Sequence, residues 1–425
     1  MTCIISFYHY KQIETNLTNS LNACIKRTFF WYDHKLNSLI GDGMETILSQ
    51  EEILRYSRHL MVPEVGLKGQ EKLKQASVLI VGTGGLGSPI SLYLTAAGIG
   101  RIGIVDFDVV DSSNLQRQIV HGDSQIGELK VNSAEMRLKD LNPFIQIETF
   151  PEYISAGNIE AIAKDYDMII DGTDNFSTRY LLNDYCVLFH KPYIYGSIFR
   201  FEGQISVFDA EKGPCYRCIF PTPPPPGLIP TCGEGGVFGV LPGTIGTLQA
   251  TEVIKIILGI GEPAYGKLYL YDALEISLQE IKLRKNPSCS VCGENPTIVN
   301  LEDTAIFCAL HDALETPIPL DWQISVSELK TKIEAGERVE LIDVRDPVER
   351  EIALIPNSKN IPYEKIIYQN NEIDKVNPTV FICRNGIRSE RVVRKLRDQG
   401  YSNVFNLKGG TNKWVESIEP DQLRY

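Results

Sequence analysis

The sequence lacks a long hydrophobic run, since no apolar segment in its 425 residues reaches the roughly 20 that a membrane-spanning helix needs. It also lacks an excess of positive charge, because 54 acidic residues against 42 lysines and arginines give a formal net charge of -12. Proteins that bind nucleic acids use clustered Lys and Arg side chains to neutralise phosphates. The two shortages argue against a membrane protein and against nucleic acid as the partner.

We also expect no secretory signal, because Lys26 and Arg27 precede no apolar core of the required kind. Its ten cysteines do not suggest a disulfide framework, since four of them form two Cys-x-x-Cys pairs and a chain of this size needs no covalent staples. We expect a reducing compartment, either a cytoplasm or an organelle stroma such as that of a plastid. Residues 1–43 show no periodicity, and an extension, a transit segment and translation begun upstream of Met44 remain alternatives.

Apolar runs of strand length alternate with helical stretches over most of the chain. A buried strand, a glycine turn and a helix are expected over residues 76–98, and further strands over 101–108, 167–174 and 192–199. Such alternation is typical of an α/β fold with a doubly wound, mainly parallel sheet, which is a nucleotide-binding architecture. The proline-rich segment 220–230 should form an extended crossover in this part of the chain.

The chain is too long for one hydrophobic core, so we expect a second domain. The pattern lapses around residues 296–322 and then resumes with a helix, a strand and another strand. We therefore predict a second, smaller α/β domain after a linker. The expected division is an N-terminal extension over 1–43, a nucleotide-binding domain over 44–300, a linker over 301–321 and the second domain over 322–425.

The segment GTGGLG, with Gly82, Gly84 and Gly87, fits the motif G-x-G-x-x-G that brings phosphates to a helix N-terminus. Asp106 follows the next strand, 19 residues after Gly87, where an acid can accept hydrogen bonds from a ribose hydroxyl. These features alone would also suit an NAD-dependent oxidoreductase. The segments that follow favour another ligand.

Two cations and a further carboxylate follow the acid: Arg117, Lys130 and Asp174. Separately, the cations could be solvated surface charges, but together the three groups suit a nucleoside triphosphate with Mg²⁺. Gln118 and Asn175 accompany them in the segments SNLQRQ and DGTDN. We therefore predict an ATP site rather than a dinucleotide site.

In this order, GTGGLG, DFD, SNLQRQ and DGTDN resemble the ubiquitin-activating-type adenylyltransferases, specifically the molybdopterin-synthase adenylyltransferase group, over residues 47–295. The resemblance implies a homodimer in which Arg58, from RYSRH, reaches the ATP of the partner subunit. It implies catalytic roles for Arg58, Arg117 and Asp174. It also implies a set of ATP contacts: Gly85, Asp106, Ser113, Asn114, Leu115, Gln116, Arg117, Lys130, Asp174 and Asn175.

CYRC and CSVC supply four thiols, Cys215, Cys218, Cys289 and Cys292, which match the closed ligand set of a structural zinc. Free or disulfide-paired thiols are the alternative, and the resemblance places zinc ligands at the same positions. Cys232, in PTCGEGG, matches the catalytic cysteine of the family, although a cysteine in a glycine-rich loop can also be incidental. Cys186, in a helical stretch, should pack in the core.

Cys383 follows a buried strand and opens the polar loop CRNGIRS, in which four residues separate it from Arg388 at the start of a helix. Backbone N–H groups, the helix N-terminus and the arginine would all stabilise a thiolate or a persulfide. With LIDVRDP, IPNSKNIP and LKGGTNKW, this loop resembles a rhodanese domain over residues 322–420. One departure is Ala353-Leu354, where that family usually has Gly-His.

Both resemblances together imply ATP-dependent adenylation of the C-terminal glycine of a small β-grasp sulfur carrier that ends in Gly-Gly. A Cys383 persulfide, loaded by a donor such as a cysteine desulfurase, would then attack the activated carbonyl, and Cys232 would release a thiocarboxylate. Motif similarity favours the molybdopterin-synthase small subunit, in molybdenum cofactor biosynthesis, over a thiamine-pathway or tRNA-thiolation carrier. An NAD-dependent oxidoreductase and a non-catalytic scaffold for ubiquitin-like partners are alternatives of other classes.

Overall fold

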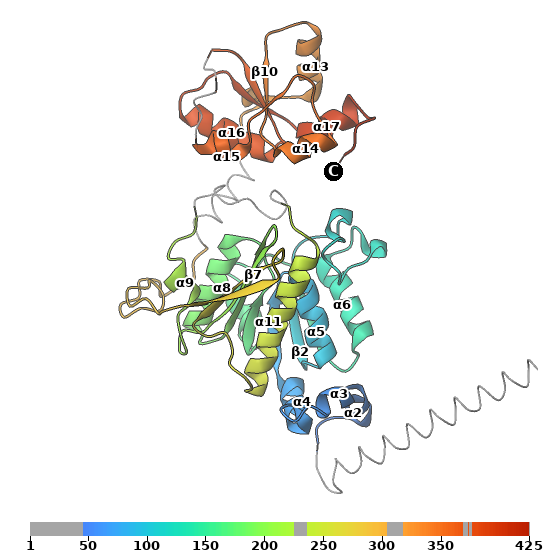
Figure 1. Ribbon diagram of the computed structural model, residues 1–425, viewed down its shortest axis with the longest axis vertical. Coiled ribbons are helices and arrows are strands. Elements are labelled where there is room, and N and C mark those ends of the chain that lie inside the picture. Colours follow the sequence, from blue (N-terminus) through green and yellow to red (C-terminus); the bar gives the residue numbers. More distant parts are fainter. Residues whose placement is uncertain (1–45, 225–235, 304–317, 369–372, 374–375, 425) are drawn as a thin grey trace, which may run out of the picture.

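The computed structural model describes residues 46–224, 236–303, 318–368, 373 and 376–424, which form two α/β units, each built around its own sheet (Figure 1). The larger sheet comes from the first part of the chain and the smaller sheet from the last part. None of the helices in these described ranges is long and apolar enough to cross a membrane.

The larger sheet has eight strands in the order β3-β2-β1-β4-β5-β6-β7-β8. The first five strands of this order pair in parallel, as predicted, whereas β6, β7 and β8 extend the sheet in antiparallel fashion, which was not predicted. The strands are β1 (Ser77–Val81), β2 (Arg101–Val105), β3 (Gln146–Phe150), β4 (Met168–Asp171), β5 (Tyr193–Phe199), β6 (Glu202–Phe208), β7 (Lys267–Asp272) and β8 (Ser277–Lys282).

Helices cover both faces of this sheet, because alternate side chains of its strands point to opposite sides. In β1, Val78 and Ile80 pack with α5, α6 and α11, whereas Leu79 and Val81 pack with α7 and α8. The helices of this unit are α2 (Gln50–Arg55), α3 (Ser57–Leu60), α4 (Gly66–Gln75), α5 (Gly87–Ala97), α6 (Lys130–Leu141), α7 (Ile159–Ala163), α8 (Phe176–Leu188), α9 (Tyr216–Ile219) and α11 (Val240–Leu258).

Two short helices, α2 and α3, follow each other over residues 50–60. Ser49 and Glu52 begin α2 with a capping box. The chain leaves helical geometry at Tyr56 (φ -90°, ψ 10°) before α3 begins. Tyr56 is buried, and its hydroxyl accepts a hydrogen bond from the Asn142 side chain at 2.8 Å. The break lets this large side chain reach the core.

The smaller sheet has the order β11-β10-β12-β13-β9, and all its strands pair in parallel. Its helices lie on two sides of the sheet, and each side has its own apolar cluster. The strands are β9 (Gln323–Ile324), β10 (Glu340–Asp343), β11 (Lys359–Asn360), β12 (Thr379–Ile382) and β13 (Val404–Leu407). The helices are α13 (Val326–Glu334), α14 (Pro347–Ile352), α15 (Tyr363–Tyr368), α16 (Ile387–Asp398) and α17 (Gly410–Ser417).

The topology of the larger sheet brings three loops together. Strands β2, β1 and β4 are neighbours, so the segments after their carboxyl ends meet at one edge of the sheet. Gly82 lets the loop after β1 lie close to the loop after β4, since it has a φ of 93° and a Cβ there would lie 2.9 Å from the backbone of Gly172. This edge is where the predicted nucleotide residues should gather.

Candidate active sites and metal centre

A cavity of about 570 Å³ opens at the carboxyl ends of β1, β2 and β4. Its volume lies within the range typical of small-molecule sites. The glycine turn, the segments after β2 and the DGTDN turn form most of its wall. The predicted nucleotide residues in its lining are Gly85, Asp106, Asn114, Arg117, Lys130, Asp174 and Asn175.

Asp106 fixes the glycine turn to the end of β2. One of its carboxylate oxygens accepts hydrogen bonds from the backbone N–H and the hydroxyl of Thr83, both at 2.8 Å. The other accepts the backbone N–H of Asp108 at 3.0 Å. Because each carboxylate oxygen has two lone pairs, Asp106 can hold this turn and still accept a hydrogen bond from a ligand hydroxyl.

The two predicted cations come from the connection between β2 and α6. Lys130 is the first residue of α6, and its buried ammonium lies 2.9 Å from the carboxylate of Asp108. Arg117 donates from its guanidinium to the Ser113 carbonyl at 3.1 Å. Lys130, with only 7% of its side chain exposed, is not a solvated surface charge.

The DGTDN turn is held by a buried network behind the cavity. Asp171, which is fully buried, accepts hydrogen bonds from the Thr173 backbone and hydroxyl and from the Tyr193 hydroxyl. Burial raises the pKa of Asp171, and the positive charge of Arg179 opposes that rise. Asn175 caps α8 by accepting the Thr178 N–H at 2.9 Å. The turn is thus fixed on both sides of Asp174.

Several residues predicted for the nucleotide site lie elsewhere. Ser113, Leu115 and Gln116 do not line the cavity, because this stretch turns through a short 3-10 helix (Ser112–Asn114) that shows only part of its surface to the cavity. Arg58 lies on α3, away from the cavity. Cys232 lies outside the described residues.

The cavity residues that were not predicted include Asp108, Gln118 and Tyr153. Asp108 belongs to the DFD segment, and its pairing with Lys130 spans 22 residues, so no local pattern indicated it. Gln118 was noted but not assigned, and its buried side-chain carbonyl lacks a hydrogen-bond partner. Tyr153 packs against Phe107 with ring centroids 5.3 Å apart and gives the cavity an aromatic wall.

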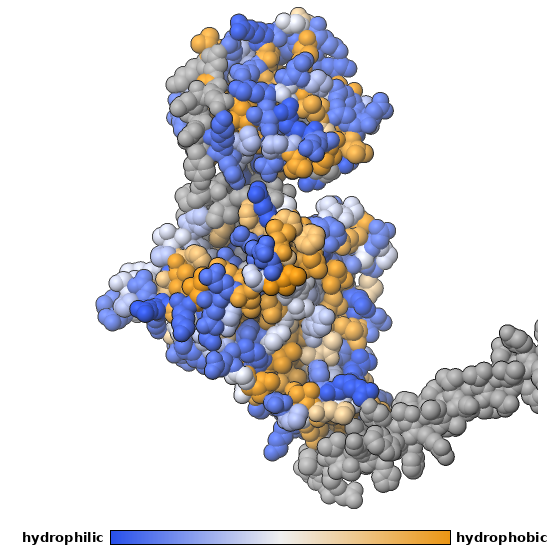
Figure 2. Space-filling model, in the orientation of Figure 1, coloured by the Kyte–Doolittle hydropathy of each residue, from blue (hydrophilic) through white to orange (hydrophobic). Residues whose placement is uncertain are grey.

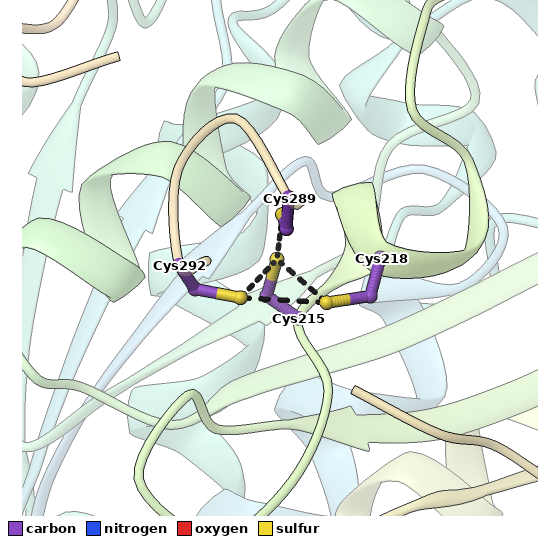
Figure 3. Close-up of side chains that lie close together, drawn as sticks. All are labelled: Cys215, Cys218, Cys289 and Cys292. Carbon is purple, nitrogen blue, oxygen red and sulfur yellow. Dashed lines mark hydrogen bonds between the residues drawn. The ribbon is translucent and has the colours of Figure 1, made fainter. Parts of the chain in front are cut away.

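The four predicted zinc ligands lie together (Figure 3). Cys215 and Cys218 lie at α9, whereas Cys289 and Cys292 lie in the loop after β8. Four of the six sulfur pairs lie between 3.4 and 3.9 Å apart, and all four sulfurs lie within 4.8 Å of one another. Tetrahedral Zn²⁺ with Zn–S bonds of about 2.3 Å needs sulfurs about 3.8 Å apart, so the donor set fits zinc.

The thiols are free rather than disulfide-bonded. The hydrogen bond from Cys215, with help from the Asn286 backbone N–H, lowers the pKa of Cys218. Cys186, by contrast, is buried in the core as predicted, and burial raises the pKa of its thiol.

Cys383 lies at the carboxyl end of β12, and its side chain is fully buried. Its sulfur accepts the backbone N–H of Gly386 at 3.1 Å and lies 3.2 Å from the Ser389 hydroxyl. Gly386 has a φ of 96°, which favours glycine, and it is the N-cap of α16. One backbone N–H and one hydroxyl of α16 thus contact the sulfur, which is part of the predicted set of donors.

The arginine that we expected beside this sulfur has another partner. Two guanidinium nitrogens of Arg388 bind the two carboxylate oxygens of Glu349, at 2.8 and 2.6 Å. The unusual pair Ala353-Leu354 forms a closed turn, because Arg345 donates to the Ala353 carbonyl and Gln422 bonds both backbone groups of Leu354. This departure therefore still forms a hydrogen-bonded turn.

Comparisons with protein families match each sheet to one family. Residues 56–291 match the ThiF family, and residues 325–417 match the rhodanese-like domain. The probable adenylyltransferase/sulfurtransferase MoeZ of Mycobacterium tuberculosis (strain ATCC 25618 / H37Rv) is 44% identical over 385 residues, covering 89% of this chain and 96% of MoeZ. The adenylyltransferase and sulfurtransferase MOCS3 of Drosophila yakuba is 40% identical over 393 residues, covering 89% and 86%.

Solved structures resemble the first part of the chain. E. coli MccB with MccA-N7isoASN matches with a TM-score of 0.50 and 26% identity, over 58% of this chain and 76% of that chain. E. coli MccB with AMPCPP and MccA matches with a TM-score of 0.51 and 25% identity, over the same shares of 58% and 76%.

Proposed function

We propose, from the premise that this chain belongs to the ThiF family and carries a C-terminal rhodanese-like domain, that it adenylates the terminal glycine of a small sulfur-carrier protein and then transfers sulfur to it. The predicted family, fold class and enzyme class, an ATP-using adenylyltransferase and sulfurtransferase, are confirmed by these matches. The NAD-dependent oxidoreductase and the scaffold lose their support. The carrier that we favour is the molybdopterin-synthase small subunit.

One observation supports the adenylation site most strongly: Arg117 and Lys130, from the connection between β2 and α6, line the same cavity as Asp174, from the turn after β4. The carboxylate of the carrier attacks the α-phosphorus of ATP, and pyrophosphate leaves with the electron pair of the broken P–O bond. Arg117 and Lys130 neutralise the charge that develops on the phosphates. Asp174 would hold a Mg²⁺ ion together with the phosphates, which adds positive charge there.

The product of the first step, an acyl adenylate, has a good leaving group. The terminal sulfur of a Cys383 persulfide attacks its carbonyl carbon, and AMP leaves. The resulting acyl disulfide is opened when the thiolate of Cys232 attacks the Cys383 sulfur, which releases the thiocarboxylate and leaves a Cys232–Cys383 disulfide for an external thiol to reduce. The donors around Cys383 support the thiolate and persulfide forms.

The proposed role of Arg58 requires a second copy of the chain. Tyr56, beside α3, packs against Gly98 at the C-terminal end of α5, whereas the cavity lies at the N-terminal end of that helix. The two ends are about 16 Å apart, which is the length of α5. Large apolar side chains of α5 and α6, such as Tyr93 and Met136, are more than half exposed. Apolar side chains also gather on the visible face around α11 and α5 (Figure 2). A homodimer would cover part of this surface.

Mixing two inactive variants is expected to restore adenylation. In a heterodimer of Arg58→Ala and Asp174→Ala subunits, one site keeps both groups. Random exchange therefore restores about a quarter of the wild-type rate per site. The rate is measured by ATP–pyrophosphate exchange after dissociation and reassembly. Mixed subunits that stay as inactive as either parent would place Arg58 in its own subunit's site or outside catalysis.

Replacing Cys218 with serine is expected to lower the melting temperature by roughly 10 °C or more, because losing a structural metal costs several kcal/mol. Zinc would bind to the wild-type chain in a one-to-one ratio, measured by elemental analysis, and would be lost from this variant. Cys186→Ala is the matched control, since it removes another largely buried thiol without touching the cluster. A fully metal-free but equally stable wild-type chain would contradict the structural zinc.

Carrier-dependent ATP–pyrophosphate exchange tests the proposed function directly. The purified chain is assayed with molybdopterin-type, thiamine-type and tRNA-thiolation carriers, each with and without its Gly-Gly tail. We expect exchange with an intact carrier, strongest with the molybdopterin-type one, and none after tail deletion. Exchange that ignores the tail, or its absence with every carrier, would overturn the proposal.

A further inference from the structure

The loop that begins at Cys383 contains two arginines, Arg384 and Arg388, and the charge of Arg388 is already matched. Arg388 and Glu349 form a two-pronged ion pair, and only 11% and 13% of their side chains are exposed. Such bidentate pairs are among the stronger and more directional ion pairs in proteins. The guanidinium is therefore committed to a carboxylate from α14, 39 residues away in sequence.

Glu349 is itself fixed in place. It is the third residue of α14, and the same oxygen that binds Arg388 accepts the backbone N–H of Asp346 at 3.0 Å, within a capping box. A carboxylate anchored at a helix N-terminus loses a cap if it swings away. The pair is thus a fixed feature of this unit.

The donors within hydrogen-bond distance of the Cys383 sulfur are neutral groups, the Gly386 N–H and the Ser389 hydroxyl. They suit one negative charge, as on a thiolate or a persulfide. A small dianion such as thiosulfate brings two more negative charges to the same loop, and these need a cation to balance them. Of the two arginines in the loop, Arg384 is half-buried and has partners of its own. Arg388 closes the loop, but Glu349 neutralises it.

We propose that Glu349, by occupying Arg388, makes the Cys383 loop accept sulfur from a protein-bound persulfide in preference to a small dianionic donor such as thiosulfate. The inference rests on the proposed function, in which Cys383 holds the sulfur as a persulfide. In the favoured reaction the Cys383 thiolate attacks the outer sulfur of the donor persulfide, and the donor cysteine leaves as a thiolate. In the disfavoured reaction it attacks the outer sulfur of thiosulfate, and sulfite leaves with the electron pair.

Glu349→Gln tests this selectivity, because the amide can still cap α14 but carries no charge. In the full-length chain, kcat/KM for thiosulfate in cyanide-dependent turnover should rise at least about tenfold, as expected when a buried charge pair is released. Loading of Cys383 by a cysteine desulfurase with cysteine, followed by mass spectrometry, should change by no more than about twofold. Glu337→Gln is the matched control, since Glu337 pairs with Lys332 at 2.6 Å in an exposed ion pair of the same unit.

The double variant Glu349→Gln/Arg388→Gln shows whether Arg388 is responsible. It should lose the gain and return to within about twofold of the wild-type thiosulfate activity. In the wild type the charge of Arg388 is paired, and in the double variant it is absent, so neither protein offers an available cation at position 388. An unchanged or lower thiosulfate activity in Glu349→Gln, or a gain that persists in the double variant, would overturn the inference.

If Glu349→Gln fails to fold, the double variant still tests the inference. A tenfold loss of its kcat/KM for thiosulfate relative to the wild type would mean that Arg388 already binds the dianion in the wild type, which would overturn the inference. Failure of the proposed function is distinguishable. In that case no donor loads Cys383 in any variant, whereas failure of this inference leaves Cys383 loaded but the preference unchanged.

Discussion

Replacing Cys383 with alanine is expected to abolish formation of the carrier thiocarboxylate while leaving ATP–pyrophosphate exchange at the wild-type rate. Removing the nucleophile of an enzyme can cost on the order of a million-fold in rate. The adenylation rate is spared because Cys383 belongs to the apolar cluster of the smaller sheet, which is separate from the clusters beneath the cavity. The loss should therefore be confined to sulfur transfer.

The measurement is mass spectrometry of the carrier, combined with pyrophosphate exchange on the same preparation. Ser389→Ala serves as a control, because it removes a hydroxyl 3.2 Å from the sulfur but keeps the thiol. That variant should retain part of the activity. A Cys383→Ala chain that forms thiocarboxylate at a rate near wild type would show that sulfur reaches the carrier by another route.

Replacing Asp174 with alanine is expected to have the opposite effect, lowering carrier-dependent pyrophosphate exchange by about a hundred- to a thousand-fold. Losses of this size follow the removal of one preorganised electrostatic group. Asp174 lines the cavity in a turn that Asp171 and Asn175 hold from both sides, so the truncation should leave the fold intact. Loading of Cys383 with persulfide should be unaffected.

Asp140→Ala is the matched control for this experiment, since it removes an acidic group whose side chain is 80% exposed and lies outside the cavity. Its exchange rate should match that of the wild type within about twofold. Exchange retained by Asp174→Ala would rule out the carboxylate as the metal-holding group of this site.

The sequence predicted the parallel part of the larger sheet because its strands are continuous apolar runs that end in recognisable polar turns. It did not predict the antiparallel strands β6, β7 and β8, and for β8 there is a clear physical reason. Every residue of β8 is exposed, so no apolar run marks that strand. The hairpin before it contains Ile276 at a φ of 49°, where a glycine or asparagine would have indicated a turn.

In the candidate sites, too, features with a local sequence motif could be predicted and features without one could not. The cysteine cluster could be predicted, although it joins residues 74 apart, because each half carries its own Cys-x-x-Cys motif. The pairs Lys130–Asp108 and Arg388–Glu349 have no such local pattern. They depend on which loops the two sheets bring together, and this is information that only the fold contains.

The most direct test of the central claim is the appearance of thiocarboxylate on a Gly-Gly-ended carrier when the full-length chain is incubated with ATP, a cysteine desulfurase, cysteine and a thiol reductant. The account predicts a carrier with one oxygen replaced by sulfur, formed only when both ATP and Cys383 are present. A carrier that is adenylated but never acquires sulfur, or that acquires it without ATP, would contradict the account.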